Sequence, residues 1–133
     1  MIVVDASVLA NFLAEDGRAG RVARTAVSRA EGVSLPDVAD VETAAVLRKR
    51  WIARSLTDER FATALATLAE LPFRRYPALA MLHRAYELRA TVTVYDSVYV
   101  ALAESLGCPL VTADTRLARA PGPRCKIQIL RSG

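Results

Sequence analysis

Length, composition and charge limit what this chain can be. It has 133 residues, of which 53% are hydrophobic and 24% are charged, and its formal net charge is +4. Such a chain can bury one hydrophobic core but is too short for two ordinary domains, so we expect a single domain over residues 1–133. It shows no apolar run of bilayer length and no signal-peptide pattern at its N-terminus, which favours a soluble, cytoplasmic protein and excludes a transmembrane one.

The cysteines and the basic residues give weaker indications. Cys108 and Cys125 have neither the number nor the spacing of a disulfide framework or a zinc site, so we expect buried free thiols. The cations are nearly all arginine, with Lys49 and Lys126 as the exceptions. A guanidinium group binds phosphate through two parallel hydrogen bonds, which fits a polyanionic partner. A genome rich in G and C also produces arginine and alanine bias, and both origins of the bias remain open.

Strand-length apolar runs alternate with helical patterns along the chain. The predicted strands are residues 1–4, 33–35, 73–76, 109–113 and 126–130. The predicted helices are residues 7–14, 19–30, 38–53, 58–71, 78–89 and 96–106, with a short helix after Asp114. This alternation predicts an α/β fold in which a central, mostly parallel sheet of about five strands is covered by helices on both faces.

Four acidic residues lie within apolar segments of this pattern: Asp5, Glu42, Asp96 and Asp114. Asp5 directly follows the first predicted strand and Asp114 follows the fourth, so both should lie at the carboxyl edge of the sheet, where parallel sheets bind ligands. Asp96 opens a helix with almost no polar face. Because buried anions are costly, we expect the four side chains either to be neutralised one by one or to surround a cation.

Three of the acids could also serve as simple helix caps. Asp5, Asp96 and Asp114 stand at predicted helix starts, where aspartate caps backbone N–H groups, and Thr93 with Asp96 resembles a capping box. Glu42 lies in mid-helix and has no capping role.

The helical neighbours Val38, Val41, Ala45 and Val46 predict apolar surroundings for Glu42, although Arg48 or Arg50 could pair with it. If the four carboxylates converge, oxygen ligands without histidine or cysteine favour Mg²⁺ or Mn²⁺, and phosphoryl chemistry on a polyanion fits the basic charge.

Several segments together resemble the PIN domain, and the whole chain resembles VapC-type toxins of type II VapBC toxin–antitoxin systems. They are VVDAS at Asp5, PDVADVETAAVLRK around Glu42, YDSVYVALAESLGCPLVT from Tyr95 and TADTRLAR at Asp114. The resemblance implies a three-layer α/β/α fold and a Mg²⁺- or Mn²⁺-dependent endoribonuclease. It further implies a homodimer, a VapB-type antitoxin and an RNA substrate of the tRNA or rRNA class.

The resemblance also assigns roles to residues. The family's acidic quartet falls on Asp5, Glu42, Asp96 and Asp114, as catalytic and metal-binding residues. Ser7 and Thr112 match hydroxyl groups that would support the ligands by hydrogen bonds. We also consider Arg116 and Arg119, on the short helix after Asp114, as possible contacts to the RNA backbone.

Three rival classes of protein fit the sequence less well. A phospho-receiver domain would need paired acids after the first strand, and a haloacid-dehalogenase-type phosphatase would need a second aspartate at Ser7. A non-catalytic PIN-like domain for RNA binding or scaffolding would be expected to have lost the acids.

Histidine and aromatic residues are left outside the site. We place His83 at a helix surface or interface. We expect the aromatic residues to pack in the core or at dimer contacts; they are Trp51, Tyr86, Tyr95 and Tyr99.

Overall fold

The computed structural model describes residues 1–131, which contain a five-stranded sheet. Its strands are β1 (Ile2–Val4), β2 (Val33–Pro36), β3 (Arg74–Tyr76), β4 (Leu110–Thr112) and β5 (Ile127–Ile129). Their spatial order is β3-β2-β1-β4-β5, and every neighbouring pair is parallel. The predicted α/β class and strand positions are therefore confirmed.

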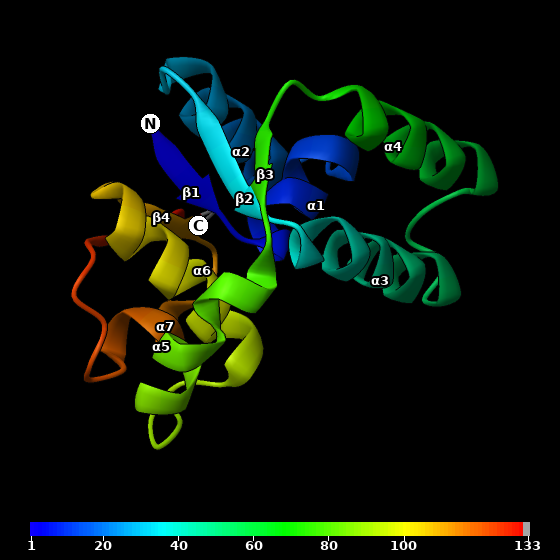
Figure 1. Ribbon diagram of the computed structural model, residues 1–133. Helices are drawn as coiled ribbons and strands as arrows, with labels where there is room; N and C mark the ends of the chain where they lie inside the picture. The colour runs from blue at the N-terminus through cyan, green and yellow to red at the C-terminus, as the bar shows by residue number, and fades with distance from the viewer. Residues whose placement is uncertain (132–133) are drawn as a thin grey trace.

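Helices cover both faces of this sheet, which makes the predicted three-layer α/β/α fold (Figure 1). On one side α1 (Ala6–Ala14) contacts α2 (Arg18–Arg29), α3 (Val38–Ile52) and α4 (Asp58–Glu70). On the other side α6 (Val94–Leu106) packs across β1, β2 and β4, and it contacts the 3₁₀ helix η1 (Ala78–Met81) and α5 (Leu82–Glu87). The short helix α7 (Thr115–Arg119) lies against β5.

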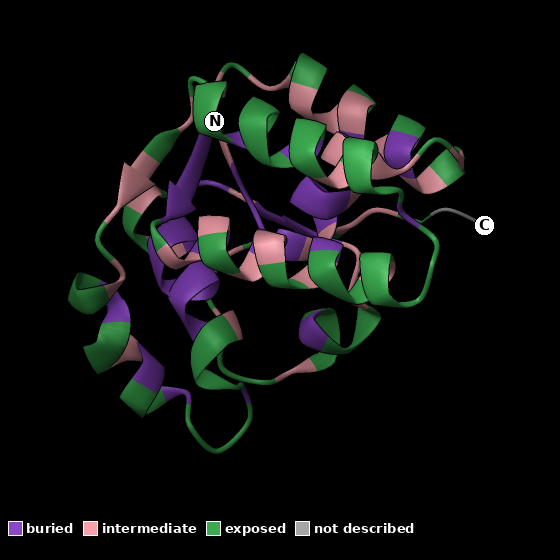
Figure 2. Cartoon of the chain, turned by 90° about the vertical axis from the view of Figure 1, so that its right-hand side faces the viewer, coloured by how far each residue is buried: buried purple, intermediate pink, exposed green. Residues whose placement is uncertain are grey.

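The main core lies between the sheet and α6. Residues from Ser97 to Ala103 are all buried, which explains why this stretch has almost no polar face in the sequence. A smaller cluster joins α1, α3 and α4 through Ala10, Leu47 and Ala64. Figure 2 shows the same layering, with buried strands behind outer helices whose solvent faces are exposed. No helix among residues 1–131 combines the length and the apolarity needed to cross a membrane.

The order of the strands creates a switch point between β1 and β4. From β1 the chain builds β2 and then β3 on one side, and it returns to place β4 and β5 on the other side. Connections therefore leave the carboxyl ends of β1 and β4 toward opposite faces of the sheet, and a crevice at such a point is the usual ligand site of this architecture.

Two predicted helices differ from the structure by two residues at one end, and the other predicted bounds differ by no more than one residue. The predicted helix over residues 78–89 is the 3₁₀ helix η1 followed by α5, which ends at Glu87. The helix predicted to open at Asp96 begins at Val94, because the Thr93 hydroxyl oxygen accepts the backbone N–H of Asp96 at 3.2 Å. Asp96 therefore lies in the first turn of α6 and is not its cap, although the predicted pairing of Thr93 with Asp96 is present.

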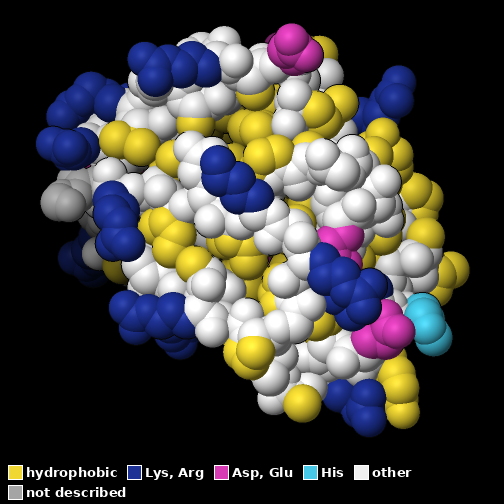
Figure 3. Space-filling model, turned by 90° about the vertical axis from the view of Figure 1, so that its left-hand side faces the viewer, with side chains coloured by type: hydrophobic (Ala, Val, Ile, Leu, Met, Phe, Trp, Pro, Cys, Tyr) yellow, Lys and Arg dark blue, Asp and Glu magenta, His cyan; other side chains and the backbone are white. Residues whose placement is uncertain are grey.

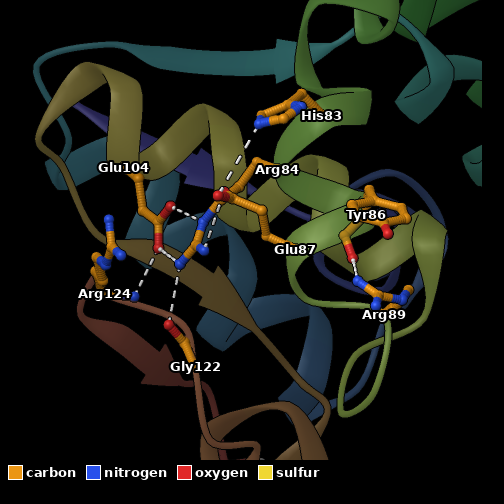
Figure 4. Close-up of polar contacts among 8 residues, drawn as sticks. All are labelled: His83, Arg84, Tyr86, Glu87, Arg89, Glu104, Gly122 and Arg124. Carbon is orange, nitrogen blue, oxygen red and sulfur yellow. Dashed lines mark hydrogen bonds and ion pairs between the residues drawn. The ribbon is translucent and has the colours of Figure 1, made fainter.

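A half-buried ion pair fixes the segment after α7 to the helices on its side of the sheet (Figure 4). The Arg84 guanidinium on α5 donates to both carboxylate oxygens of Glu104 on α6, at 2.8 and 3.1 Å, and to the carbonyl oxygen of Gly122 at 3.0 Å. Glu104 also accepts the backbone N–H of Arg124 at 2.6 Å. These contacts hold the segment that follows α7 against α5 and α6.

Both cysteines are free, as the sequence predicts, but only Cys108 is buried. Cys125 is half-buried, and burial raises the pKa of its thiol to about 11. Such a thiol is protonated near neutral pH and is a poor nucleophile.

Candidate functional site

Asp5 lies at the carboxyl end of β1 and caps α1. Its Oδ1 accepts the Ser7 hydroxyl at 2.6 Å and the backbone N–H of Val8 at 3.1 Å, while its Oδ2 accepts the hydroxyl of Thr112 from β4. The side chain is buried, and burial raises its pKa although these hydrogen bonds work in the opposite direction. The Asp5 carboxylate thus caps α1 with one oxygen and links β1 to β4 with the other.

Hydroxyl groups join the segments that follow β1 and β4. Thr112 accepts the backbone N–H of Asp114 at 3.0 Å, and Ser7 accepts the backbone N–H of Ala113 at 3.3 Å. The structure therefore places Ser7 and Thr112 directly beside Asp5. Their positions fix both the Asp5 carboxylate and the loop that leads to Asp114.

Asp114 caps α7, where its Oδ1 accepts the backbone N–H of Arg116 at 2.9 Å. Burial would raise the pKa of Asp114, but the backbone and side-chain hydrogen bonds of Arg116 and its charge together hold that pKa below its usual value. The exposed Arg116 guanidinium lies 3.4 Å from Asp114, so it faces the acid here. Arg119 is exposed.

Glu42 lies on α3 beside a buried stripe made by Ala39, Thr43 and Leu47. The predicted apolar neighbours were partly wrong, since Val41 is 72% exposed and Ala45 is also exposed.

The prediction that Arg48 or Arg50 could pair with Glu42 was also wrong. Arg50 donates to the side-chain oxygen of Asn11 at 2.7 Å, and Arg48 is exposed. The hydroxyl of Tyr99 donates to Glu42 at 2.6 Å instead.

Tyr99 is the site residue that the sequence interpretation missed. It lies on α6 one turn after Asp96, and its side chain is buried. Burial, followed by the hydrogen bond to Glu42, raises its pKa far above the usual range, so it remains a protonated donor. A phenol buried in an otherwise apolar helix must find an acceptor, and its spacing from Asp96 was the signal that could have identified it.

The pKa shifts show that the acids lie within electrostatic reach of one another. Burial raises the pKa of Asp96, and the charges of Asp5 and Asp114 raise it further. Burial likewise raises the pKa of Glu42, with additional increases from Asp96 and Asp5. Within residues 1–131, none of Asp5, Glu42 and Asp96 forms an ion pair with a basic side chain.

A small pocket opens between two of these acids. Its volume is about 210 Å³, and its lining includes Thr93 and Asp96 from the start of α6 and Asp114, Arg116 and Leu117 from the start of α7. A ligand in this pocket would therefore meet carboxylates from two elements, Asp96 from α6 and Asp114 from the N-terminal cap of α7.

The donor set fits a hard divalent cation. Asp5, Glu42, Asp96 and Asp114 offer only oxygen atoms, which Mg²⁺ and Mn²⁺ prefer, and the first three lack a cation of their own among residues 1–131. Across the same residues no group of three or more His, Cys, Asp or Glu side chains is arranged to hold a metal ion. The fit therefore depends on the oxygen chemistry and mutual charge of the four acids; hydroxyl groups donate to Asp5 and Glu42, and Arg116 is the partner of Asp114.

Sequence comparison identifies the family of proteins to which this chain belongs. A profile of the PIN domain matches residues 2–123, so the chain belongs to the PIN-domain family. Ribonuclease VapC12 of Mycobacterium tuberculosis is 38% identical over 130 residues, which cover 98% of this chain and 99% of that protein. Ribonuclease VapC1 of the same species is 37% identical over 131 residues, covering 97% of each chain.

Solved structures agree with this fold. Mycobacterium tuberculosis VapC20, described as a sarcin-ricin loop cleaving toxin, superimposes with a TM-score of 0.71 at 17% identity, covering 90% of this chain and 94% of that one. FitAcB from Neisseria gonorrhoeae gives a TM-score of 0.60 at 16% identity, with 96% of each chain covered. At these identities the likeness concerns the fold alone.

Proposed function

We propose that this protein is a ribonuclease and the toxin of a VapBC-type toxin–antitoxin module, with residues 1–133 forming one PIN domain. The observation that carries the proposal is that Asp5 and Asp114 follow β1 and β4, the strands of the switch point, while Asp96 lines a pocket together with Asp114 and Glu42 accepts the hydroxyl of Tyr99 on the same helix as Asp96. The full-length similarity to relatives named VapC ribonucleases supports the same conclusion.

The proposed reaction is hydrolysis of an RNA phosphodiester bond. Asp5, Asp96 and Asp114 would hold a Mg²⁺ or Mn²⁺ ion, directly or through water. When bound, such an ion lowers the pKa of a coordinated water and neutralises charge on the phosphate group. Ser7 and Thr112 keep the Asp5 carboxylate in one orientation through the hydrogen bonds described above.

Glu42 has a separate role in this proposal. It would either bind the ion or accept a hydrogen bond from the attacking water and so orient it. The Tyr99 hydroxyl fixes the Glu42 carboxylate at 2.6 Å and remains protonated, so it acts as a positioning residue. Arg116 pairs with Asp114 here, and it could exchange that contact for an RNA phosphate because its side chain is 88% exposed.

The partners follow from the same family. We propose an RNA substrate of the tRNA or rRNA class, a VapB-type antitoxin and a homodimer. Exposed apolar side chains on η1, α5 and the start of α6 support the homodimer, and Leu79 is the most exposed of them at 80%.

Cleavage of RNA by the purified protein tests the proposal through Asp96→Asn. This substitution keeps the backbone N–H that Thr93 caps but removes one carboxylate charge. We expect wild-type protein to cut RNA only with Mg²⁺ or Mn²⁺, and the variant to be slower by about two orders of magnitude or more. Mg²⁺ should also raise the melting temperature of the wild type more than that of the variant.

Asp58→Asn is the matched control because Asp58 is an exposed aspartate in the first turn of α4. It should cleave like wild type. Equal cleavage by wild type and Asp96→Asn would contradict the proposed site. RNA binding without any metal-dependent cleavage would instead favour a non-catalytic PIN-like domain for RNA binding or scaffolding.

A further inference from the structure

A groove runs along α2, outside the pocket of acids. It has a volume of about 550 Å³, and α2 contributes Arg18, Arg21 and Arg29 to its lining. Apolar side chains from the sheet and its edges line the same groove, namely Ile2, Val111 and Leu130. We call this feature the α2 groove. It joins a row of cations to an apolar surface.

The three arginines form one stripe. Steps of three and eight residues return to nearly the same side of a helix with 3.6 residues per turn, and α2, with its 12 residues, extends over about 18 Å. All three side chains reach the surface, and among residues 1–131 none of them forms an ion pair. Arg24 on the same helix differs, because its guanidinium donates to the carbonyl oxygen of Glu15 at 3.0 Å.

Contacts with the end of α1 hold α2 in place. Gly20 approaches the chain so closely that a Cβ atom there would lie 1.7 Å from the carbonyl oxygen of Glu15. Together with the Arg24 hydrogen bond, this packing fixes the position of the arginine stripe relative to α1.

A second hollow extends from the α2 groove toward Asp114. Its volume is about 240 Å³, and it shares Val22 and Leu130 with the α2 groove. That hollow is also lined by Ala113 and Thr115, the residues on either side of Asp114. The two hollows together therefore lead from the arginines of α2 to the residues next to Asp114, which lines the acidic pocket.

We propose that the α2 groove binds the sugar–phosphate backbone of single-stranded RNA on its way to the acidic pocket, with Arg18, Arg21 and Arg29 as phosphate contacts. The inference rests on the proposed ribonuclease function. A polyanion approaching four carboxylates needs cations beside them, and this stripe supplies guanidinium groups without ion pairs among residues 1–131 on a path to Asp114. In the left half of the face in Figure 3 the coloured charged side chains are Lys and Arg, with hydrophobic atoms between them.

The salt dependence of RNA binding tests this inference. The probe is a short fluorescein-labelled single-stranded RNA of mixed sequence, with binding followed by anisotropy in EDTA over a range of KCl concentrations. Each phosphate contact to a single strand contributes about 0.7 to the slope of log K against log salt. The triple variant Arg18→Gln/Arg21→Gln/Arg29→Gln should therefore lose about 2 from that slope and bind at least about tenfold more weakly at low salt.

The control triple variant is Arg48→Gln/Arg54→Gln/Arg74→Gln, which removes the same amount of charge from elsewhere on the surface. Arg48 lies on α3, Arg54 follows the residue that caps the end of α3, and Arg74 lies on β3. It should keep nearly the wild-type slope. In cleavage assays with Mg²⁺, the α2 variant should raise KM and leave kcat near the wild-type value. A helix whose role is only structural would not produce that split.

The outcomes separate the two proposals. If both triple variants bind RNA with the same salt slope, the inference fails. The same result is expected if the groove binds an acidic protein segment or a second copy of this chain instead of RNA. If the arginine dependence appears while wild type cuts no RNA with Mg²⁺ or Mn²⁺, the groove inference stands and the ribonuclease proposal fails.

Discussion

The hydrogen bond from Tyr99 to Glu42 joins α6 to α3 at the candidate site. Tyr99→Phe removes only the hydroxyl group and leaves the buried ring in place. Without its donor, Glu42 should lose its fixed orientation, so we expect kcat to fall about tenfold with little change in KM. The free energy of unfolding should fall by about 1 kcal/mol. Cleavage kinetics and urea unfolding measure the two effects.

Tyr95→Phe is the matched control because Tyr95 is 60% exposed and lies on the same helix. It should leave kcat and stability unchanged. A Tyr99→Phe protein with lowered stability but wild-type kcat would show that this hydroxyl serves packing alone.

The sequence placed the acids better than it placed their partners. Asp5 and Asp114 follow strands, and a strand end fixes where the next side chain lies in a parallel sheet, so their position at the carboxyl edge was predictable. Helix capping and a place in the site also proved compatible for Asp5, whose two oxygens face different partners. The Glu42 partner was not predictable, because Tyr99 lies 57 residues away and meets it only through packing of α3 and α6.

At the scale of elements, the pair formed by Arg84 and Glu104 ties α5 to α6. Burial alone would raise the pKa of Glu104, but hydrogen bonds from Arg84 and from the backbone of Arg124 hold that pKa below its ordinary value. A depressed pKa in the folded state stabilises the protein above the unfolded-state pKa, and this stability is lost as the pH falls through the folded-state value.

Glu104→Gln should therefore reduce the free energy of unfolding by about 2 kcal/mol near neutral pH and make its decline below about pH 4.5 shallower. Urea unfolding at a series of pH values measures both effects. Glu87→Gln is the control, because Glu87 pairs with Arg84 at 3.4 Å but its side chain is 49% exposed. Its pH profile should follow the wild type, and parallel profiles for all three proteins would refute the assignment.

Helix positions were predictable from periodicity, but helix faces and ends were not. The capping hydroxyl of Thr93 moves the start of α6 to Val94, and the segment after Pro77 forms a 3₁₀ turn before α5. On α3, valine and alanine occur on several sides, so the sequence pattern did not show that the buried stripe is Ala39, Thr43 and Leu47. Such errors arise because packing partners, and not propensity, choose the buried face.

At the scale of the whole molecule, exposed apolar side chains gather on connected elements. Leu79, Leu82 and Tyr86 lie on η1 and α5 and are 80%, 43% and 62% exposed. Val94 and Tyr95, in the first turn of α6, are 55% and 60% exposed. These elements contact one another. Several exposed apolar side chains on neighbouring elements of a small domain are typical of a protein interface.

Leu79→Arg tests whether this surface forms the proposed homodimer. An unpaired guanidinium in an apolar contact carries a large desolvation cost, so the variant should elute as a 14.4 kDa monomer in size-exclusion chromatography with light scattering, where wild type gives twice that mass. Its melting temperature at low protein concentration should stay unchanged, because Leu79 is largely exposed within one chain. Leu65→Arg on α4, where the leucine is 39% exposed, is the control and should remain dimeric. A wild type that stays monomeric at high concentration would contradict the homodimer. A Leu79→Arg protein that stays dimeric would show that the dimer interface lies elsewhere.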